Sequence, residues 1–204
     1  MRFRIPYATV ALAAVLALVY VIERHPDTGV QTGQYFLSAV SVGSLPQLWS
    51  EYLLLAVGGT VAEQFVSRAS LIGFTVLLAA GTIWLVESTH PNTVVVGLSG
   101  GSMGLIGFST LAVAWYVVDR PESHAAFLAF SAFLLVASFY VSRSAYGYLV
   151  HTPILPASTP VRFYHPHTAY LAHVAGLSAG GLWWIVTHYL GYAHPRTYPS
   201  RATA

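Results

Sequence analysis

The chain has 204 residues, of which 55% are apolar, 14% are aromatic and only 8% are charged, and its mean hydropathy is +0.62. Water-soluble domains usually contain about 25% charged residues, so this composition argues against a cytosolic enzyme, a nucleic-acid-binding protein and a disordered tail. The formal net charge is +2, and the arginines form no basic run, so we expect no nucleic-acid partner. The absence of cysteine excludes disulfides, thiol nucleophiles and Cys-ligated metal.

Long apolar runs predict an all-α membrane protein with six spans. A helix needs about 20 mostly apolar residues to cross the hydrocarbon of a bilayer, and charges, prolines and glycines mark its ends. In chain order the predicted spans cover residues 5–21, 45–66, 70–86, 97–118, 124–141 and 168–190. The first run resembles a signal peptide, but it ends at Glu23 and Arg24 rather than at a small-residue cleavage site, so we expect a retained helix.

The arginines predict the orientation, because cytoplasmic loops carry an excess of positive charge. An N-terminus inside the cell puts six arginines on the cytoplasmic side and three outside. The six are Arg2, Arg4, Arg68, Arg120, Arg196 and Arg201, and the three are Arg24, Arg143 and Arg162. Both termini are therefore expected to be cytoplasmic, and the spans 97–118 and 168–190 are expected to begin at the outer face.

Four polar side chains inside the predicted spans are selected as functional candidates, because ionisable or catalytically capable groups are costly there. They are Glu51 and Glu63 in the second span, Ser99 in the fourth and His173 in the sixth. Glu63 follows Glu51 by 12 residues, which places it about 18 Å deeper along a helix. We interpret Glu63 as a structural residue that bonds backbone or hydroxyl groups.

Ser99 stands between glycines, with Gly97 before it and Gly100 and Gly104 after it. Glycines four residues apart are typical of closely packed membrane helices. They also clear space for a substrate backbone, and a Ser99 N–H in the first turn of a helix is free to stabilise an oxyanion. Ser102 is the second candidate nucleophile.

His173 precedes a second pair of glycines four residues apart, Gly176 and Gly180. A single histidine in a span also fits a packed side chain bonded to a carbonyl. Counted from the outer ends of their spans, however, Ser99 and His173 agree in depth within roughly 5 Å. A neutral imidazole can take the proton from a serine hydroxyl and make it nucleophilic. The pair therefore predicts a catalytic dyad, and no acid is placed to complete a triad.

The two motifs resemble those of the rhomboid family of intramembrane serine proteases. That family has GxSGxxxG at the start of its fourth helix and AHxxGxxxG in its sixth. Both stand here, from Gly97 to Gly104 and from Ala172 to Gly180. The resemblance implies a single six-helix rhomboid-like domain over residues 1–204, in a prokaryotic cell membrane. It implies cleavage of transmembrane segments near the outer face, with Ser99 as nucleophile, His173 as base and then acid, and no cofactor.

The second span departs from the family pattern. The family usually carries a histidine there and, four residues later, an asparagine, and both side chains help to hold the oxyanion. An ungapped match puts Gln47 and Glu51 at these positions, whereas a shift by one residue puts Pro46 and Ser50 there. Gln47 can donate through its amide. An ionised Glu51 would repel the oxyanion, but a protonated Glu51 could donate to it. The family's Trp-Arg pair is also missing from residues 24–43.

Two other functions stay open at this stage. The changes at Gln47 and Glu51 favour a catalytically impaired pseudoprotease that binds transmembrane helices. A small transporter or proton relay would use Glu51, Glu63 and His173, although no inverted halves are evident. His165 and His167 have no third ligand at a helical spacing, so we predict no metal site. The sequence leaves the substrate and the oligomeric state open.

Overall fold

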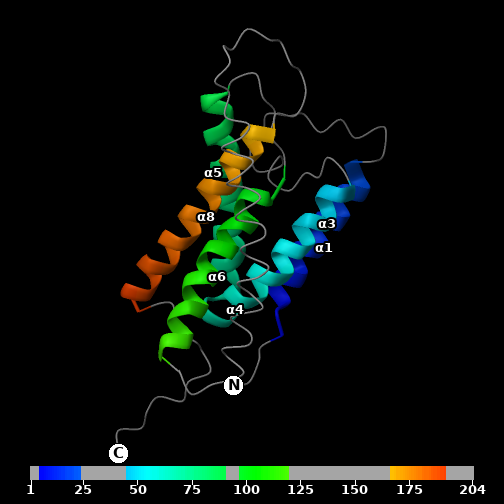
Figure 1. Ribbon diagram of the computed structural model, residues 1–204. Coiled ribbons are helices and arrows are strands. Elements are labelled where there is room, and N and C mark those ends of the chain that lie inside the picture. The colour runs from blue at the N-terminus through cyan, green and yellow to red at the C-terminus, as the bar shows by residue number, and fades with distance from the viewer. Residues whose placement is uncertain (1–4, 24–44, 91–96, 120–165, 192–204) are drawn as a thin grey trace, which may run out of the picture.

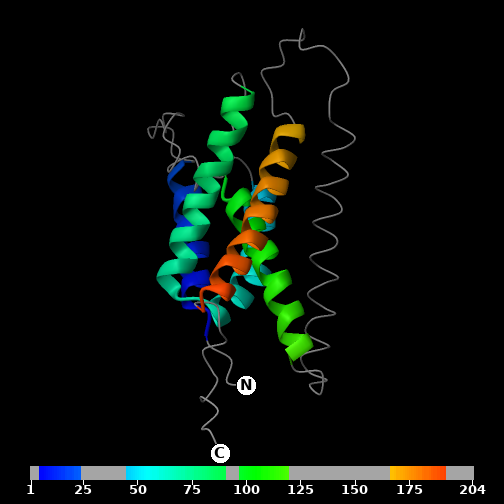
Figure 2. The same ribbon diagram turned by 90° about the vertical axis from the view of Figure 1, so that its left-hand side faces the viewer.

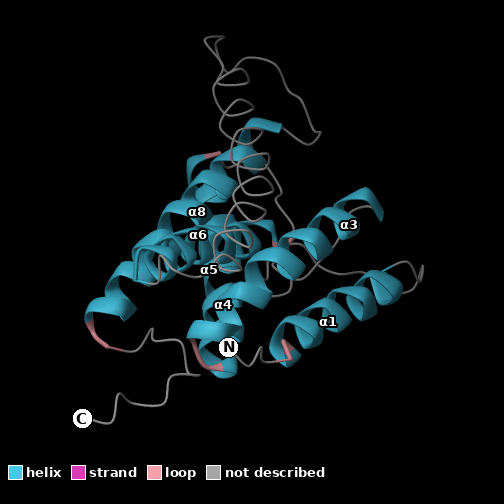
Figure 3. Ribbon diagram, turned by 60° about the horizontal axis from the view of Figure 1, so that its bottom comes forward, coloured by secondary structure: helices cyan, strands magenta, loops and turns pink. Residues whose placement is uncertain are grey.

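A computed structural model describes residues 5–23, 45–90, 97–119 and 166–191, and every regular element in these ranges is a helix (Figures 1 and 3). Four helices are single segments: α1 is Tyr7–Glu23, α5 is Arg68–Thr89, α6 is Ser99–Asp119 and α8 is Pro166–Tyr189. A further continuous helical run consists of α3 (Leu45–Leu54), the π-helical turn η1 (Leu55–Gly59) and α4 (Thr60–Phe65). The predicted all-α class is confirmed for the described ranges.

These helices coincide with five of the six predicted spans, and their ends differ from the predicted ends by at most three residues. The predicted span 124–141 lies outside the described residues, so the six-helix bundle stays a prediction. The helix at the fourth span begins at Ser99 rather than at Gly97. The reason is the backbone of Gly97, whose φ of +118° is not helical.

Two helices, α5 and α6, are long and apolar enough to cross a membrane, judged by length and composition. They contain 22 and 21 residues. With a rise of about 1.5 Å per residue, they extend about 33 and 31 Å, which matches a hydrocarbon core of about 30 Å. Helix α1 is also apolar but is shorter.

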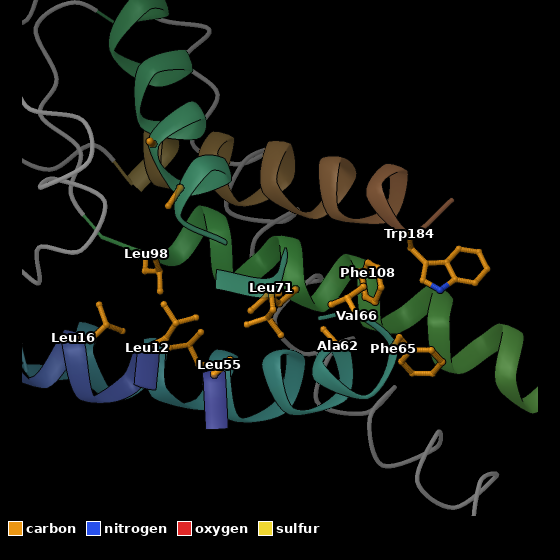
Figure 4. Close-up of a cluster of buried hydrophobic side chains, with 14 of the residues drawn as sticks. Leu12, Leu16, Leu55, Ala62, Phe65, Val66, Leu71, Leu98, Phe108 and Trp184 are labelled. Carbon is orange, nitrogen blue, oxygen red and sulfur yellow. The ribbon is translucent and has the colours of Figure 1, made fainter. Parts of the chain in front are cut away.

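Helix α6 is the centre of the described bundle. Helices α8 and α5 and the run from α3 to α4 all pack against it, while α1 packs against α5 and against the run from α3 to α4 (Figures 1 and 2). Helices α6 and α8 run in the same direction, and α5 runs the opposite way. The core between these helices is apolar: Leu12 and Leu16 of α1 meet Leu55 and Leu98 there (Figure 4). The first half of α6 is therefore almost entirely buried.

The turn η1 interrupts the second helical run at two glycines. A Cβ atom at Gly58 would lie 2.9 Å from the backbone nitrogen of Ile106 on α6, and one at Gly59 would lie 2.9 Å from Thr9 Oγ1 on α1. Hydrogen bonds in a π-helix shift by one residue, and here the Gly58 carbonyl oxygen accepts a hydrogen bond from Ser109 Oγ at 2.8 Å. The sequence predicted a regular helix at this place, because apolar periodicity does not report a π-turn.

Glu63 joins the beginning of α1 to the end of the second helical run. Its buried carboxylate accepts hydrogen bonds from the backbone N–H groups of Ala8 and Thr9, both at 3.1 Å, and from Thr9 Oγ1 at 3.2 Å. The Arg68 guanidinium adds an ion pair at 3.2 Å. First-turn N–H groups have no partner within their own helix, so Glu63 caps α1 from another helix. The interpretation of Glu63 as structural is confirmed.

Candidate functional site

Ser99 is the first residue of α6, and a turn at Gly97 places it there. The positive φ of Gly97 lies in the left-handed region, which glycine adopts without the steric cost of a Cβ atom. The N–H of Ser102 bonds to the Leu98 carbonyl oxygen at 2.8 Å, so helical hydrogen bonding starts directly after the turn. The N–H of Ser99 therefore precedes the intrahelical ladder. Its side chain is half-buried.

Helices α6 and α8 cross through facing glycines. A Cβ atom at Gly176 would overlap the carbonyl oxygen of Gly100, and a Cβ atom at Gly180 would overlap the carbonyl oxygen of Gly104. A Cβ atom at Gly104 would in turn lie 3.3 Å from the Gly176 carbonyl oxygen. These four glycines provide the close backbone approach that small residues permit between membrane helices.

This crossing brings Ser99 and His173 to nearly the same level. Ser99 precedes Gly100 by one residue, and His173 precedes the facing Gly176 by three. Because the two helices run in the same direction, Ser99 and His173 differ in level by two residues, which corresponds to about 3 Å along the helix axes. Both side chains are half-buried. Among the described residues no hydrogen bond joins the two side chains, and catalytic hydrogen bonds are often long in the absence of substrate.

An aromatic side chain that the sequence analysis missed lies against the imidazole. The ring of Tyr170 meets the ring of His173 edge-on, with centroids 6.1 Å apart and an interplanar angle of 83°. Edge-to-face contacts of this kind are favourable and directional. The sequence could have indicated this contact, because Tyr170 and His173 are three residues apart and side chains at that spacing share one face of a helix.

Helix α3 brings Gln47 and Glu51 to the same turn. A Cβ atom at Gly97 would overlap Gln47 Nε2 and would lie 3.1 Å from Glu51 Oε1. The Glu51 side chain is fully buried, and its Oε2 accepts a hydrogen bond from Ser102 Oγ at 3.1 Å. The backbone N–H of Ser99 lies close to the same carboxyl group. Gln47 and Glu51 are one helical turn apart and therefore face the start of α6 together.

The alternative register of the second span is not supported at this turn. Ser50 Oγ donates to the carbonyl oxygen of Gln47 in its own helix, at 2.8 Å. The side chain of Pro46 lies outside the described residues. Gln47 and Glu51 of the ungapped register both lie beside Gly97.

Ser102 is less suited than Ser99 to act as a nucleophile. It is fully buried, and it donates its hydroxyl proton to Glu51. It also lies three residues deeper in α6 than Ser99. Ser99, which is half-buried and level with His173, is the better placed of the two serines.

Metal-ligating side chains do not gather in the part of the chain that the structure describes: no group of three or more His, Cys, Asp or Glu residues there could hold a metal ion. His165 and the side chain of His167 lie outside the described residues.

Comparisons of the chain with protein-family models, with curated protein sequences and with solved structures give no match. The function must therefore be inferred from the site itself. The site consists of a serine at the start of a helix, an imidazole at the same level on a parallel helix, and an amide and a carboxyl group beside the turn before the serine.

Proposed function

We propose that this protein is an intramembrane serine endopeptidase, which cleaves transmembrane segments of membrane-protein substrates near the outer face of the bilayer. The observation that carries the proposal is the glycine-to-glycine contact of α6 with α8, which puts Ser99 and His173 at one level. The resemblance of both motifs to those of rhomboid proteases supports it. The assignment to that family and the complete six-helix bundle are parts of the same proposal.

The proposed reaction uses Ser99 and His173 as a dyad. Ser99 Oγ attacks the carbonyl carbon of the scissile peptide bond, while His173 takes the hydroxyl proton. The new C–O bond forces the carbonyl electron pair onto oxygen, which becomes an oxyanion. When the oxyanion collapses, the C–N bond breaks and His173 gives its proton to the leaving amine. Water, activated by His173, then hydrolyses the acyl ester and restores the Ser99 hydroxyl.

Two groups of the site would stabilise the oxyanion. The N–H of Ser99 belongs to the first turn of α6, and the side-chain amide of Gln47 adjoins Gly97. Preorganised donors of this kind act on charge that develops only during the reaction, and losing one of them costs roughly 100- to 1,000-fold in rate. Gly97 and Gly100 leave room for the backbone of the substrate around Ser99.

The proposed location follows from the two long apolar helices and the position of Ser99. Helices α5 and α6 have the length of a bilayer's hydrocarbon core, and Ser99 stands at one end of α6. The dyad would therefore act near one membrane surface, where water can enter. We propose a multi-pass protein of a prokaryotic cell membrane, with both termini cytoplasmic and the lipid bilayer around it.

A second candidate function is a pseudoprotease that binds transmembrane helices without cleaving them. The observation that favours it is the position of Glu51, whose carboxyl group lies beside the N–H of Ser99. An ionised carboxylate at this place would repel the oxyanion and would slow or prevent cleavage.

Labelling with a fluorophosphonate probe separates the two functions without a known substrate. We expect the purified protein in detergent to be labelled, and the label to disappear in Ser99→Ala and His173→Ala. Matched controls are Ser178→Ala, an exposed serine on α8, and His188→Ala at the other end of that helix; both should label like the wild type. An unlabelled wild type beside a reactive rhomboid protease, or a label that survives Ser99→Ala, would contradict the protease proposal.

A further inference from the structure

The carboxyl group of Glu51 has an unusual hydrogen-bonding state. It is fully buried, and Oε2 accepts a hydrogen bond from Ser102 Oγ. The other oxygen, Oε1, is buried and forms no hydrogen bond with any of the described residues. This atom is the one that faces the turn at Gly97, because a Cβ atom there would lie 3.1 Å from it. An unpartnered, buried polar atom is therefore directed at the start of α6.

Among the described elements that pack against α3, none supplies a cation to balance a negative charge on Glu51. Helix α3 packs against α1, η1 and α6, and these elements contain no Arg, Lys or His. Their titratable residues are Tyr7, Tyr20, Glu23, Tyr116 and Asp119, all of which are acids. His173, on α8, is needed as a neutral base in the proposed reaction. Burying a carboxylate without a cation is strongly unfavourable, so the surroundings favour the neutral carboxylic acid.

A neutral carboxylic acid has one O–H donor and can still accept. Ser102 already donates to Oε2, so the proton belongs on Oε1, which accepts no hydrogen bond within the part of the chain that the structure describes. This O–H would lie beside the N–H of Ser99. Two donors would then be available together at the start of α6, where the proposed reaction forms its oxyanion.

We infer that Glu51 is a neutral acid whose Oε1–H donates a hydrogen bond to the oxyanion formed at Ser99. The inference rests on the proposed protease function and adds a catalytic residue to it. The O–H stays on Glu51 throughout, so no proton is transferred in this step. Acids held neutral by an apolar site can serve as oxyanion donors. A donor that finds its acceptor only when the oxyanion forms lowers the barrier rather than merely tightening substrate binding.

The inference makes a definite prediction for the effect of pH. Raising the pH removes the donor and creates a repelling charge, so the rate must fall on the alkaline side as Glu51 loses its proton. Lowering the pH protonates His173 and removes the base, so the rate must also fall on the acid side. Only the alkaline fall depends on Glu51.

The test compares Glu51→Gln, which keeps an N–H donor but cannot ionise, with Glu51→Met, which has a similar length but no donor. The readout is the second-order rate of fluorophosphonate labelling, in which Ser99 Oγ displaces fluoride from phosphorus and the phosphoryl oxygen takes the oxyanion position. We expect Glu51→Gln to stay within about tenfold of the wild type and Glu51→Met to be slower by roughly 100- to 1,000-fold. Glu51→Gln should also lose the alkaline fall, whereas the matched control Glu87→Gln on α5 should keep it.

Infrared spectroscopy gives a readout that does not require activity. The wild type at neutral pH should show the C=O stretching band of a carboxylic acid, and this band should be absent from Glu51→Gln but present in Glu87→Gln. A labelled wild type without the band would overturn the inference and leave the protease proposal intact. Equal rates for Glu51→Met and wild type, or equally slow rates for Glu51→Met and Glu51→Gln, would also overturn it. An unlabelled wild type that shows the band would refute the protease proposal and this catalytic role with it.

Discussion

Replacing Gly180 with alanine should force α6 and α8 apart. The added Cβ atom would lie 2.5 Å from the carbonyl carbon of Gly104 and 2.7 Å from its Cα atom, and closer still to the carbonyl oxygen. Non-bonded carbon atoms are at their optimum at about 3.5–4.0 Å. All three atoms belong to the backbone and cannot rotate away, so the helices must separate by about 1 Å. Overpacking of this kind costs roughly 1–3 kcal/mol.

The measurement is the free energy of unfolding, from a titration with SDS followed by far-UV circular dichroism. The matched control is Gly81→Ala on α5, because no atom lies within 4 Å of a Cβ atom placed there. Alanine is the better helix former by about 1 kcal/mol, so this control should be as stable as the wild type or slightly more stable. Equal unfolding of Gly180→Ala and Gly81→Ala would refute the argument that glycines set the spacing of the two helices.

The same substitution should also slow labelling of Ser99. A displacement of about 1 Å between reacting groups can lower the rate about 100-fold. Gly180 lies seven residues beyond His173, so the change acts on the position of the imidazole without touching it. A stable Gly180→Ala variant that is labelled at the wild-type rate would show that this helix contact does not position the dyad.

Two further predictions concern buried hydrogen bonds. Glu63→Ala leaves the buried first-turn N–H groups of α1 without an acceptor and should destabilise the protein by roughly 1–3 kcal/mol for each group. Arg68→Ala removes a partner that is 58% exposed and leaves the other hydrogen bonds of Glu63 in place, so it should cost less. SDS titration measures both, and similar losses would contradict the capping role. Ser109→Ala removes the donor to the Gly58 carbonyl oxygen and should cost about 1–3 kcal/mol, while Thr110→Ala, which alters a bond within α6 alone, should cost less.

The second helical run shows where prediction from the sequence fails. Its ends were predicted closely, since the apolar stretch ends at Ser67 and Arg68. The π-turn at Gly58 and Gly59 was not predicted, because it depends on contacts with α1 and α6. The choice between Gln47 with Glu51 and Pro46 with Ser50 stayed open for the same kind of reason. A shift of one residue leaves the composition of a span unchanged but turns different side chains toward its neighbours.

The sequence by itself determined the helices and the residues capable of chemistry. Apolar runs bounded by charges and prolines are sufficient to predict the helices, since each helix satisfies the hydrogen bonds of its own backbone. Costly polar groups inside the spans indicate the residues capable of chemistry. The tertiary structure alone decided which of these residues meet. Through the facing glycines it put Ser99 level with His173, and it turned one oxygen of Glu51 toward the start of α6 and the other toward Ser102. Contacts between segments so far apart in the chain depend on how the helices pack, which no local pattern specifies.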